Sequence, residues 1–333
     1  MKILVTGGSG FIGINFISKA LDNGHFIYNI DNLSLFKKDY NKRNKNYLFK
    51  KVDIRDKSCL TGIFNEFKPN KVVHLAAESH VDNSIENPEN FMTTNILGTY
   101  NILQATLDFF KSKNVPKNFC FHHVSTDEVY GSLKKNEAPF TEKSVYKPNS
   151  PYSASKASSN HLVRAWQKTF NLPCVITSCS NNFGPYQHPE KFIPVVIIKG
   201  LMKKKIPIYG NGRNIRDWIY VEDHIDALIS IMEKNFINKT FLIGANSEKE
   251  NIETVNTICD ILNDIWDNSY LHQDLKTFVK DRLGHDVRYA INSKLLQKEI
   301  QWKPRNNFLN GVKKTIDWYI RNKNWWTEIT GLK

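Results

Sequence analysis

The stretch 2-KILVTGGSGFIG-13 decides the fold, because a short apolar run leads at once into three glycines at three-residue intervals. Lys2–Thr6 has the composition of a buried strand, and the residues that follow have the apolar spacing of a helix. Between a strand and a helix, Gly7 allows a tight turn, Gly10 lets backbone amides approach a pyrophosphate, and Gly13 lets the helix pack closely on the strand. The positive end of the helix dipole points at the phosphates. The stretch therefore predicts a dinucleotide-binding loop.

A carboxylate follows where such loops place one. Asp31 ends the second apolar run, eighteen residues after Gly13, and a carboxylate there accepts hydrogen bonds from the adenosine ribose. The same charge repels a 2′-phosphate, so the sequence predicts NAD in preference to NADP. A strand, turn and helix without a ligand is the less favoured interpretation.

Short β-rich runs alternate with helical patterns through the first half of the chain. This alternation is typical of parallel strands joined by crossover helices, so we predict an α/β fold with a Rossmann-type doubly wound parallel sheet. The expected covering helices are Phe11–Leu21, Ser58–Phe67, Asn90–Phe110 and Ser153–Phe170.

After Ser180 the alternation gives way to turn-rich loops, which predicts a smaller, mixed C-terminal substrate domain. A helical pattern and a strand pattern return between 219 and 243, so we expect the chain to cross back once to the first domain. The expected boundaries are 1–179 plus about 215–244 for the NAD-binding domain, and about 180–214 plus 245–333 for the substrate domain.

The composition excludes several classes of protein. Of the 333 residues, 41% are hydrophobic and 24% are charged, which is ordinary for globular domains, and no apolar run approaches the roughly 20 residues of a membrane-spanning helix. The first apolar run leaves no room for a signal peptide, so we expect a cytoplasmic protein. The five cysteines are odd in number and lack CxxC or Cys/His spacing, which predicts reduced thiols and no metal site.

The formal charge of +13 is compatible with an anionic ligand but does not say which one. The basic clusters, such as Lys203–Lys205, are short and are not interleaved with aromatic residues as on a nucleic-acid surface. We therefore expect no nucleic-acid partner. The alternative is a non-catalytic protein that binds nucleic acid in a salt-sensitive way, without turnover.

Four pairs fit the pattern Tyr-x-x-x-Lys, so the pattern alone carries little information. They are Tyr47 with Lys51 on a predicted strand, Tyr130 with Lys134 in a predicted loop, Tyr152 with Lys156, and Tyr319 with Lys323 in a predicted C-terminal helix. Only Tyr152 and Lys156 lie one turn apart on a helix that follows the fifth strand. To act as a base near neutral pH, the phenol of Tyr152 needs a pKa about 3 units below its ordinary value near 10. This shift corresponds to about 4 kcal/mol of stabilisation of the phenolate by its surroundings. We expect Lys156 and a nicotinamide cation to lower this pKa.

The segment 125-STDEVYG-131 comes at the carboxyl end of the fifth strand, where open α/β sheets bind ligands. If it curls past the strand end, Asp127 and Glu128 both face the substrate, one protonated as an acid and the other ionised as a base. Such a pair favours an elimination. Two carboxylates that only cap the next turn are the alternative.

Together the glycine loop, Asp31 and the set of Thr126, Tyr152 and Lys156 resemble the extended short-chain dehydrogenase/reductase family over nearly the whole chain. Within it the chain is most similar to the branch of the dTDP-glucose 4,6-dehydratases. The motifs that carry this similarity are 75-LAAESHVD-82, 125-STDEVYG-131, 150-SPYSASKASS-159, 180-SNNFGPYQHPEKFIP-194 and 281-DRLGHDVRYA-290. The adjacent Asp127 and Glu128 distinguish this branch from the other branches of the family. The family's sugar epimerases usually lack both carboxylates, and its GDP-mannose dehydratases and UDP-glucuronate decarboxylases usually have Ser in place of Asp127.

The resemblance implies dehydration of dTDP-glucose to dTDP-4-dehydro-6-deoxyglucose in deoxysugar (rhamnose-type) biosynthesis. Tyr152, tuned by Lys156 and helped by Thr126, would remove the C4 hydroxyl proton while a hydride passes to NAD. Glu128 would take the C5 proton as Asp127 protonates the departing C6 hydroxyl, and the hydride would return to C6. An NAD-dependent epimerase or decarboxylase of the same family is the alternative. Glu128→Gln separates the two, since it should block water loss but hardly affect an epimerase.

The resemblance also implies two sets of binding residues. For NAD they are Gly7, Gly10, Phe11, Ile12, Gly13, Asp31, Asn32, Leu33, Ser34, Asp53, Ile54, Leu75, Ala76, Ala77, Ser79, Thr94, Tyr152, Lys156 and Asn182. For the nucleotide sugar they are Ser79, Thr126, Asn181, Lys191, Phe192, Pro207, Ile208, Tyr209, Arg216, Asn251, Asp281, Arg282, Leu283, Gly284 and His285.

Members of the family commonly form homodimers through helices of the nucleotide domain that pack as a four-helix bundle, and we expect the same here. The chain departs from the family pattern after Asp31, where 32-NLSLF-36 replaces a Thr-Tyr-Ala-Gly-like stretch. It also has Phe183, His188 and Leu283 where tyrosine, phenylalanine and proline are common.

Overall fold

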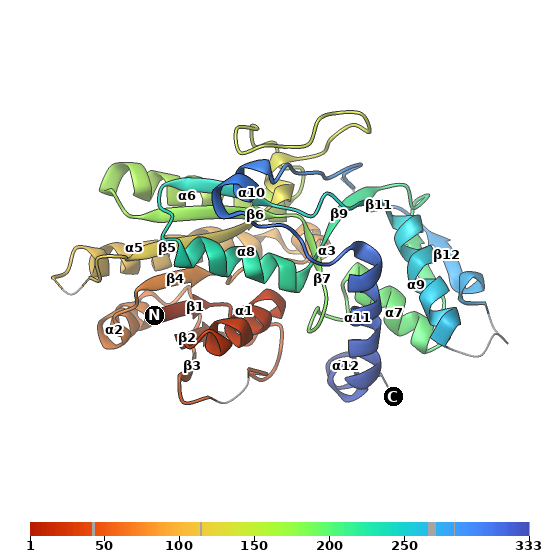
Figure 1. Cartoon of the computed structure of the whole chain (residues 1–333), viewed down its shortest axis with the longest axis horizontal. Helices are drawn as coiled ribbons and strands as arrows, with labels where there is room; N and C mark the ends of the chain where they lie inside the picture. Colours follow the sequence, from red (N-terminus) through yellow and green to blue (C-terminus); the bar gives the residue numbers. More distant parts are fainter. Residues whose placement is uncertain (42–43, 114, 266–270, 283, 333) are drawn as a thin grey trace.

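The computed structural model describes residues 1–41, 44–113, 115–265, 271–282 and 284–332. Within these ranges the centre of the molecule is a seven-stranded parallel sheet in the order β10-β6-β5-β4-β1-β2-β3 (Figure 1). Its strands are β1 (Lys2–Thr6), β2 (Phe26–Asp31), β3 (Tyr47–Lys51), β4 (Lys71–His74), β5 (Cys120–Thr126), β6 (Cys174–Cys179) and β10 (Lys239–Ile243). The reversal of strand order beside β1 is the doubly wound pattern, and the predicted fold class is confirmed.

Both faces of the sheet are covered, because alternate residues of each strand point to opposite sides. In β1, Ile3 and Val5 join one core cluster and Leu4 joins another. The first cluster includes side chains of α1 (Phe11–Asp22) and α8 (Val221–Glu233). The second includes side chains of α2 (Lys57–Phe67), α5 (Gly98–Phe110) and α6 (Pro151–Phe170).

The helix expected over Asn90–Phe110 is interrupted. The chain forms α3 (Val81–Glu86), α4 (Pro88–Phe91), a π-helix η1 (Met92–Leu97) and only then α5. Inside η1, the Asn95 amide accepts a hydrogen bond from Glu78 N (2.8 Å) and donates one to Glu78 O (3.0 Å). A π-turn changes which side chains face inward, and such turns are frequent at functional sites.

The remaining elements form a smaller part beyond the sheet, with its own apolar cluster. Its strands are β7 (Asn181–Phe183), β8 (Ile206–Tyr209), β9 (Ile215–Tyr220), β11 (Glu248–Glu250) and β12 (Lys276–Val279). Its helices are α7 (Phe192–Leu201), α9 (Asn251–Ile265), the short η3 (His272–Leu275), α11 (Phe308–Arg321) and α12 (Lys323–Thr330), while α10 (Lys294–Ile300) contacts β10. β9 pairs with β7 and β11, and β8 with β12. The expected return of the chain to the large sheet is made by α8 and β10.

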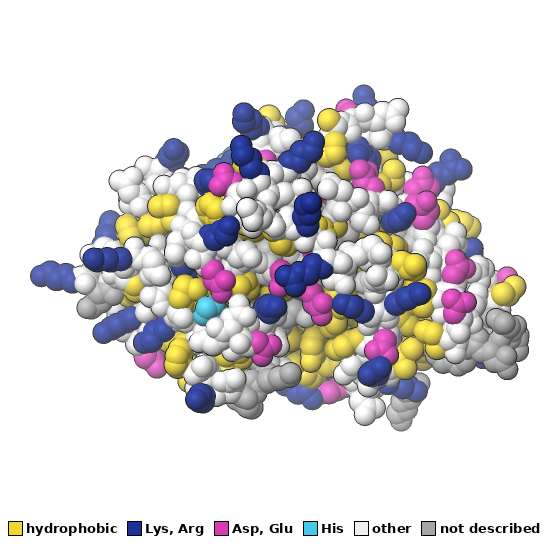
Figure 2. All heavy atoms as spheres, viewed as in Figure 1, with side chains coloured by type: hydrophobic (Ala, Val, Ile, Leu, Met, Phe, Trp, Pro, Cys, Tyr) yellow, Lys and Arg dark blue, Asp and Glu magenta, His cyan; other side chains and the backbone are white. Residues whose placement is uncertain are grey.

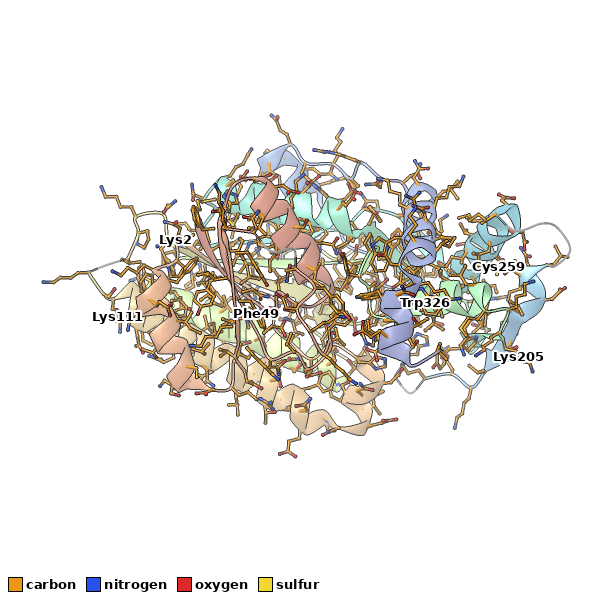
Figure 3. All side chains as sticks on the ribbon, turned by 90° about the horizontal axis from the view of Figure 1, so that it is seen from below. Lys2, Phe49, Lys111, Lys205, Cys259 and Trp326 are labelled. Carbon is orange, nitrogen blue, oxygen red and sulfur yellow. The ribbon has the colours of Figure 1, made fainter. Side chains whose placement is uncertain are left out.

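The molecule is elongated, and Lys111 and Cys259 lie toward opposite ends of it in Figure 3. In the face drawn in Figure 2, lysines and arginines are dispersed among acidic side chains and form no continuous stripe. Over the described ranges, none of the helices combines the length and apolarity that a bilayer crossing requires. The five cysteines all fall in described ranges and are free thiols.

Candidate active site

The glycine loop lines a cavity of about 320 Å³ at the carboxyl ends of the central strands. Gly7 has φ +73°, and a Cβ there would lie 2.5 Å from Ala76 N; a Cβ at Gly13 would lie 2.4 Å from Gly7 O. The fold itself therefore requires these two glycines. A Cβ at Gly10 would meet only Gly7 O, at 3.4 Å. Since packing does not exclude a side chain at Gly10, its bare backbone leaves room for a phosphate in the cavity.

Asp31 lies in the wall of the same cavity at the end of β2. Its carboxylate accepts hydrogen bonds from Ser9 N (3.0 Å) and Leu33 N (2.7 Å). Burial raises the pKa of this carboxyl, and the two backbone donors oppose that rise. A carboxylate beside the glycine loop fits ribose hydroxyls and disfavours a 2′-phosphate, so the residues present fit NAD.

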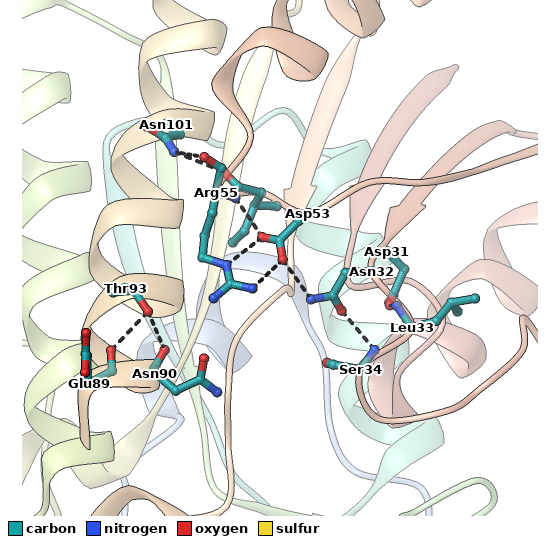
Figure 4. Close-up of polar contacts among 11 residues, drawn as sticks. Asp31, Asn32, Leu33, Ser34, Asp53, Arg55, Glu89, Asn90, Thr93 and Asn101 are labelled. Carbon is teal, nitrogen blue, oxygen red and sulfur yellow. Dashed lines mark hydrogen bonds and ion pairs between the residues drawn. The ribbon is translucent and has the colours of Figure 1, made fainter. Parts of the chain in front are cut away.

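Asp53 is occupied by other side chains (Figure 4). Arg55 binds it with Nε (3.0 Å) and Nη2 (2.7 Å), and Asn32 Nδ2 donates to it at 3.2 Å. These hydrogen bonds, with Arg55 first, lower the pKa of Asp53 to about 2. Asp53 thus holds Asn32, which does line the cavity, in place.

Tyr152 and Lys156 enter the cavity from the first turns of α6. The helix begins there because Ser150 and Ser153 form a reciprocal capping box and Pro151 occupies the first turn. Lys156 Nζ donates to Val124 O of β5 at 2.9 Å, which fixes the ammonium against the strand. Burial lowers the pKa of Lys156 to about 8.

The protein alone does not lower the pKa of Tyr152, and the expected lowering by Lys156 together with a nicotinamide cation stays a prediction. Burial, followed by the nearby charge of Glu128, raises this pKa well above its usual value, and a hydrogen bond to Thr126 opposes the rise only in part. The physical reason is desolvation, which disfavours the phenolate more than neighbouring groups stabilise it.

Asp127 and Glu128 form the short 3-10 helix η2 (Asp127–Tyr130) directly after β5, so the segment does curl past the strand end. Asp127 is 1% exposed, and its Oδ2 has no hydrogen-bond partner among the described residues. Burial and then the charge of Glu128 raise its pKa well above the usual value. Burial also raises the pKa of Glu128, but Arg216 opposes that rise. The pKa is therefore raised in both carboxyls, and further in Asp127 than in Glu128.

A second cavity of about 260 Å³ adjoins the first. The two share lining residues, namely Ser79, Glu128, Asn181, Asn182, Gln187 and Lys191. The second cavity carries the cationic side chains of Lys191, Arg216 and Arg282. Arg216 is held by its Nη2 on Asp286 O (3.0 Å) and by its stacking over Tyr289. An anionic ligand could therefore bind these cationic side chains in the second cavity and extend from there to Glu128, which lines both cavities.

Known proteins with similar sequences indicate the family of this chain. A family model described as GDP-mannose 4,6 dehydratase matches residues 4–315. The dTDP-glucose 4,6-dehydratase of Shigella flexneri is 47% identical to this chain, over 98% of this chain and 94% of its own length.

Solved structures agree with the sequence match. The dTDP-glucose 4,6-dehydratase of Bacillus anthracis, in complex with NAD, is 38% identical with a TM-score of 0.86 and covers 99% of both chains. That of Streptomyces venezuelae is 34% identical with a TM-score of 0.89, over 99% of this chain and all of the other. This chain belongs to the dTDP-glucose 4,6-dehydratase family.

The cavities contain most of the residues that the family resemblance indicated. Of the NAD set, Leu33 and Asp53 do not line the first cavity. Of the substrate set, Ile208, Asn251 and Asp281 line neither cavity, and Leu283 lies outside the described residues. Ile208 is fully buried because, in β8, it points to the side opposite its neighbours Pro207 and Tyr209.

Several cavity residues of this dehydratase-family chain were not singled out from the sequence. Ser125 and Gln187 line the first cavity, and Tyr289 and Asp82 line the second. Asp82 forms an ion pair with Arg282, with Nη2 to Oδ2 at 2.8 Å. All four fall inside the quoted family motifs, so the motif boundaries could have indicated them, but only packing shows which motif residues face the cavity.

The other Tyr-x-x-x-Lys pairs have structural surroundings. Tyr47 donates to Asp39 at 2.6 Å. Tyr130 lies in η2, not in a loop, and packs on Phe140 and Tyr146. Tyr319 and Lys323 do not share one helix, because α11 ends at Arg321 and α12 begins at Lys323.

Proposed function

We propose that this chain is an NAD-dependent hydro-lyase that converts dTDP-glucose to dTDP-4-dehydro-6-deoxyglucose, a step in deoxysugar biosynthesis of the rhamnose type. The observation that carries the proposal is the position of Asp127 and Glu128 in one cavity with Tyr152. An epimerase has no use for two further carboxyls there, because it eliminates nothing.

The glycine loop, Asp31 and Lys156 would hold NAD in the first cavity. When bound, NAD supplies reversible hydride transfer and a positive charge close to Tyr152. Tyr152 takes the proton of the C4 hydroxyl, and its high pKa in the protein alone means that the phenolate depends on that added charge. Thr126 opposes the rise in the pKa of Tyr152 and so favours the phenolate.

The carboxyls then carry out the elimination. A ketone at C4 acidifies the C5 hydrogen, and Glu128, stabilised as a carboxylate by Arg216, removes it. Asp127, kept protonated by burial, donates its proton to the departing C6 hydroxyl. Glu128 afterwards returns its proton to C5. The diphosphate would bind beside Lys191 and Arg216 in the second cavity.

We also propose a homodimer. Apolar side chains are exposed on the helices that cover one face of the sheet: Leu97 of η1 is 56% exposed, Tyr100 of α5 38% and Phe170 of α6 38%. Tyr100 and Phe170 both contact Trp166, so the apolar surface is continuous across α5 and α6. This surface, which we call the α5/α6 surface (Leu97, Tyr100, Trp166 and Phe170), suits a second copy of the chain.

Two further expectations stand as proposals. We propose that the chain divides into an NAD-binding domain (1–179 plus about 215–244) and a sugar-nucleotide-binding domain (about 180–214 plus 245–333), with β10 on the large sheet in support of the chain's return. Two elements lie across these bounds, since β9 pairs with β7 and β11 of the smaller part and α10 contacts β10 of the large sheet. A cytoplasmic location, without membrane or nucleic-acid partners, is supported by the free thiols and, on the face drawn in Figure 2, by basic side chains dispersed among acidic ones.

The purified protein should be incubated with dTDP-glucose and no added reductant, and followed by mass and by the absorbance of a 4-keto sugar in alkali. Loss of one water without net NADH supports the proposal. A changed C4 configuration without mass loss would favour the epimerase instead. UDP-glucose in a parallel reaction tests the preference for thymidine.

A further inference from the structure

The loop after β2 differs from the family pattern, and its aromatic residue is deeply buried. Phe36 is 2% exposed although it lies five residues beyond the strand. Its ring contacts Trp325 (5.5 Å between centroids) and Tyr40 (5.8 Å), and it packs against His188 (5.6 Å). Trp325 belongs to α12, so the C-terminal helix packs directly on this loop.

The same loop forms part of the NAD cavity. Ser34, Leu35 and Phe36 line it, as does His188, whose ring centroid lies 5.6 Å from that of Phe36. A displacement of Phe36 would therefore change the wall of the cavity itself.

The loop is also hydrogen-bonded to the glycine loop. Asp39 Oδ1 accepts from Ser9 Oγ at 2.9 Å, and Asn41 Nδ2 donates to Gly8 O at 3.1 Å. Asn41 is buried, so this contact is shielded from water. Contacts thus run from α12 through the loop after β2 to Gly8 and Ser9 of the glycine loop.

Within α12 the contacts to the loop are divided unequally. Trp325 contacts both Phe36 and Tyr40 and is 8% exposed. Glu328 pairs with Lys38 at 2.9 Å, but both side chains are more than half exposed, so this pair contributes little. Trp326 is buried as well, yet its indole donates to Tyr319 O of α11 and no ring contact joins it to the loop in the described structure. Trp325 is therefore the main link.

We propose that Trp325 is a positioning residue for NAD: it holds Phe36 and so fixes the wall of the adenosine site and the glycine loop behind it. The proposal rests on the proposed function in one respect, that NAD is the ligand of the first cavity. A cofactor that must stay bound through a whole turnover benefits from a preformed site, because less ordering is required when it binds.

The test compares Trp325→Ala, Trp325→Phe and the matched control Trp326→Ala in the full chain. The dissociation constant of NAD is measured by equilibrium dialysis, and kcat and the KM for dTDP-glucose are measured at saturating NAD. Trp325→Ala should weaken NAD binding at least tenfold while KM for the sugar nucleotide stays within about twofold. Trp325→Phe, which keeps an aromatic contact, should recover binding to within about threefold of the wild type.

Trp326→Ala lowers the melting temperature by removing a buried indole of the same helix, but it should leave NAD binding within about threefold. The proposal fails if Trp325→Ala binds NAD like the wild type, or if Trp326→Ala weakens binding to the same extent. Should Trp325→Ala not fold, Phe36→Leu tests the same contact from the loop side. If the wild-type protein binds NAD but does not dehydrate dTDP-glucose, the proposed function fails. The test of Trp325 remains valid in that case, because it measures the dissociation constant of NAD.

Discussion

Asp127 and Glu128 are adjacent in the chain, but their surroundings differ. Asp127 is 1% exposed and its Oδ2 has no hydrogen-bond partner among the described residues, whereas Glu128 lines both cavities. After burial, the next largest influence on the pKa of Asp127 is the charge of Glu128, which raises it, and on the pKa of Glu128 it is the charge of Arg216, which lowers it. This difference in solvation and neighbouring charge supports the acid and base roles proposed for them.

For Glu128→Gln we expect loss of water to slow by at least about 100-fold, since the amide cannot remove the C5 proton. The amide keeps the size of the side chain, so the affinity for dTDP-glucose should stay within about threefold. Mass spectrometry of the product and a binding isotherm give the two values. Water loss at the wild-type rate would exclude Glu128 as the base.

Asp127→Asn should stabilise the protein increasingly as pH rises. In the unfolded chain the carboxyl ionises near its ordinary value of 3.8, whereas in the folded protein burial keeps it protonated far above that pH. The folded state therefore retains a proton that the unfolded state loses, and the wild type loses about 1.4 kcal/mol per pH unit between the two pKa values. Asparagine does not ionise, so the variant does not lose this stability as the pH rises.

The melting temperatures of wild type and Asp127→Asn should be compared at about pH 4.5 and about pH 7.5, with a larger gain for the variant at the higher pH. Asp22→Asn, at an exposed position, serves as the control for the same exchange of a carboxyl for an amide outside the core. A gain for Asp127→Asn that is independent of pH would mean that this carboxyl ionises normally in the folded protein.

At the scale of elements, the glycines of the phosphate loop serve two different purposes, because one is required by packing of the fold and another leaves space for a ligand. Gly13 is needed by the fold, because a Cβ would collide with Gly7 O, whereas Gly10 has room for a Cβ on the protein side. We expect Gly10→Ala to melt within about 2 °C of the wild type without NAD but to bind NAD at least tenfold more weakly. Gly13→Ala should lose stability as well. Thermal unfolding with and without NAD distinguishes the two effects, and a fully stabilising response of Gly10→Ala to NAD would contradict the assignment.

The helix predicted over Asn90–Phe110 shows where element prediction reaches its limit. Its apolar spacing identifies a helix correctly, but within the π-turn of η1 Asn95 forms two hydrogen bonds with Glu78 of a separate segment. Local propensity contains no information on such a contact, since it requires two segments brought together by the sheet.

For the whole molecule, the α5/α6 surface predicts how the chain associates. Leu97→Glu would place a charge in the centre of an apolar interface and should convert the dimer to a monomer at micromolar concentration. Leu309→Glu is the matched control, because Leu309 is 45% exposed on α11, away from this surface, and should leave the dimer intact. Sedimentation equilibrium gives the mass of each. An unchanged mass for Leu97→Glu, or a wild type that is itself a monomer, would contradict the proposed dimer.

The sequence by itself determined the phosphate loop, the order of strands and helices in the first half, and the adjacency of Asp127 and Glu128. These features depend on residues close together in the chain, where glycine conformation, strand alternation and helix spacing act directly. The cavities also contain most of the binding residues that the family motifs indicated.

Only the tertiary structure decided which carboxyl is buried, that Lys156 bonds to Val124, and that Trp325 packs on Phe36 nearly three hundred residues away. Each of these depends on desolvation or on contacts between distant segments. Both arise only when the sheet, its covering helices and the C-terminal helices pack together, and so no local pattern in the chain records them.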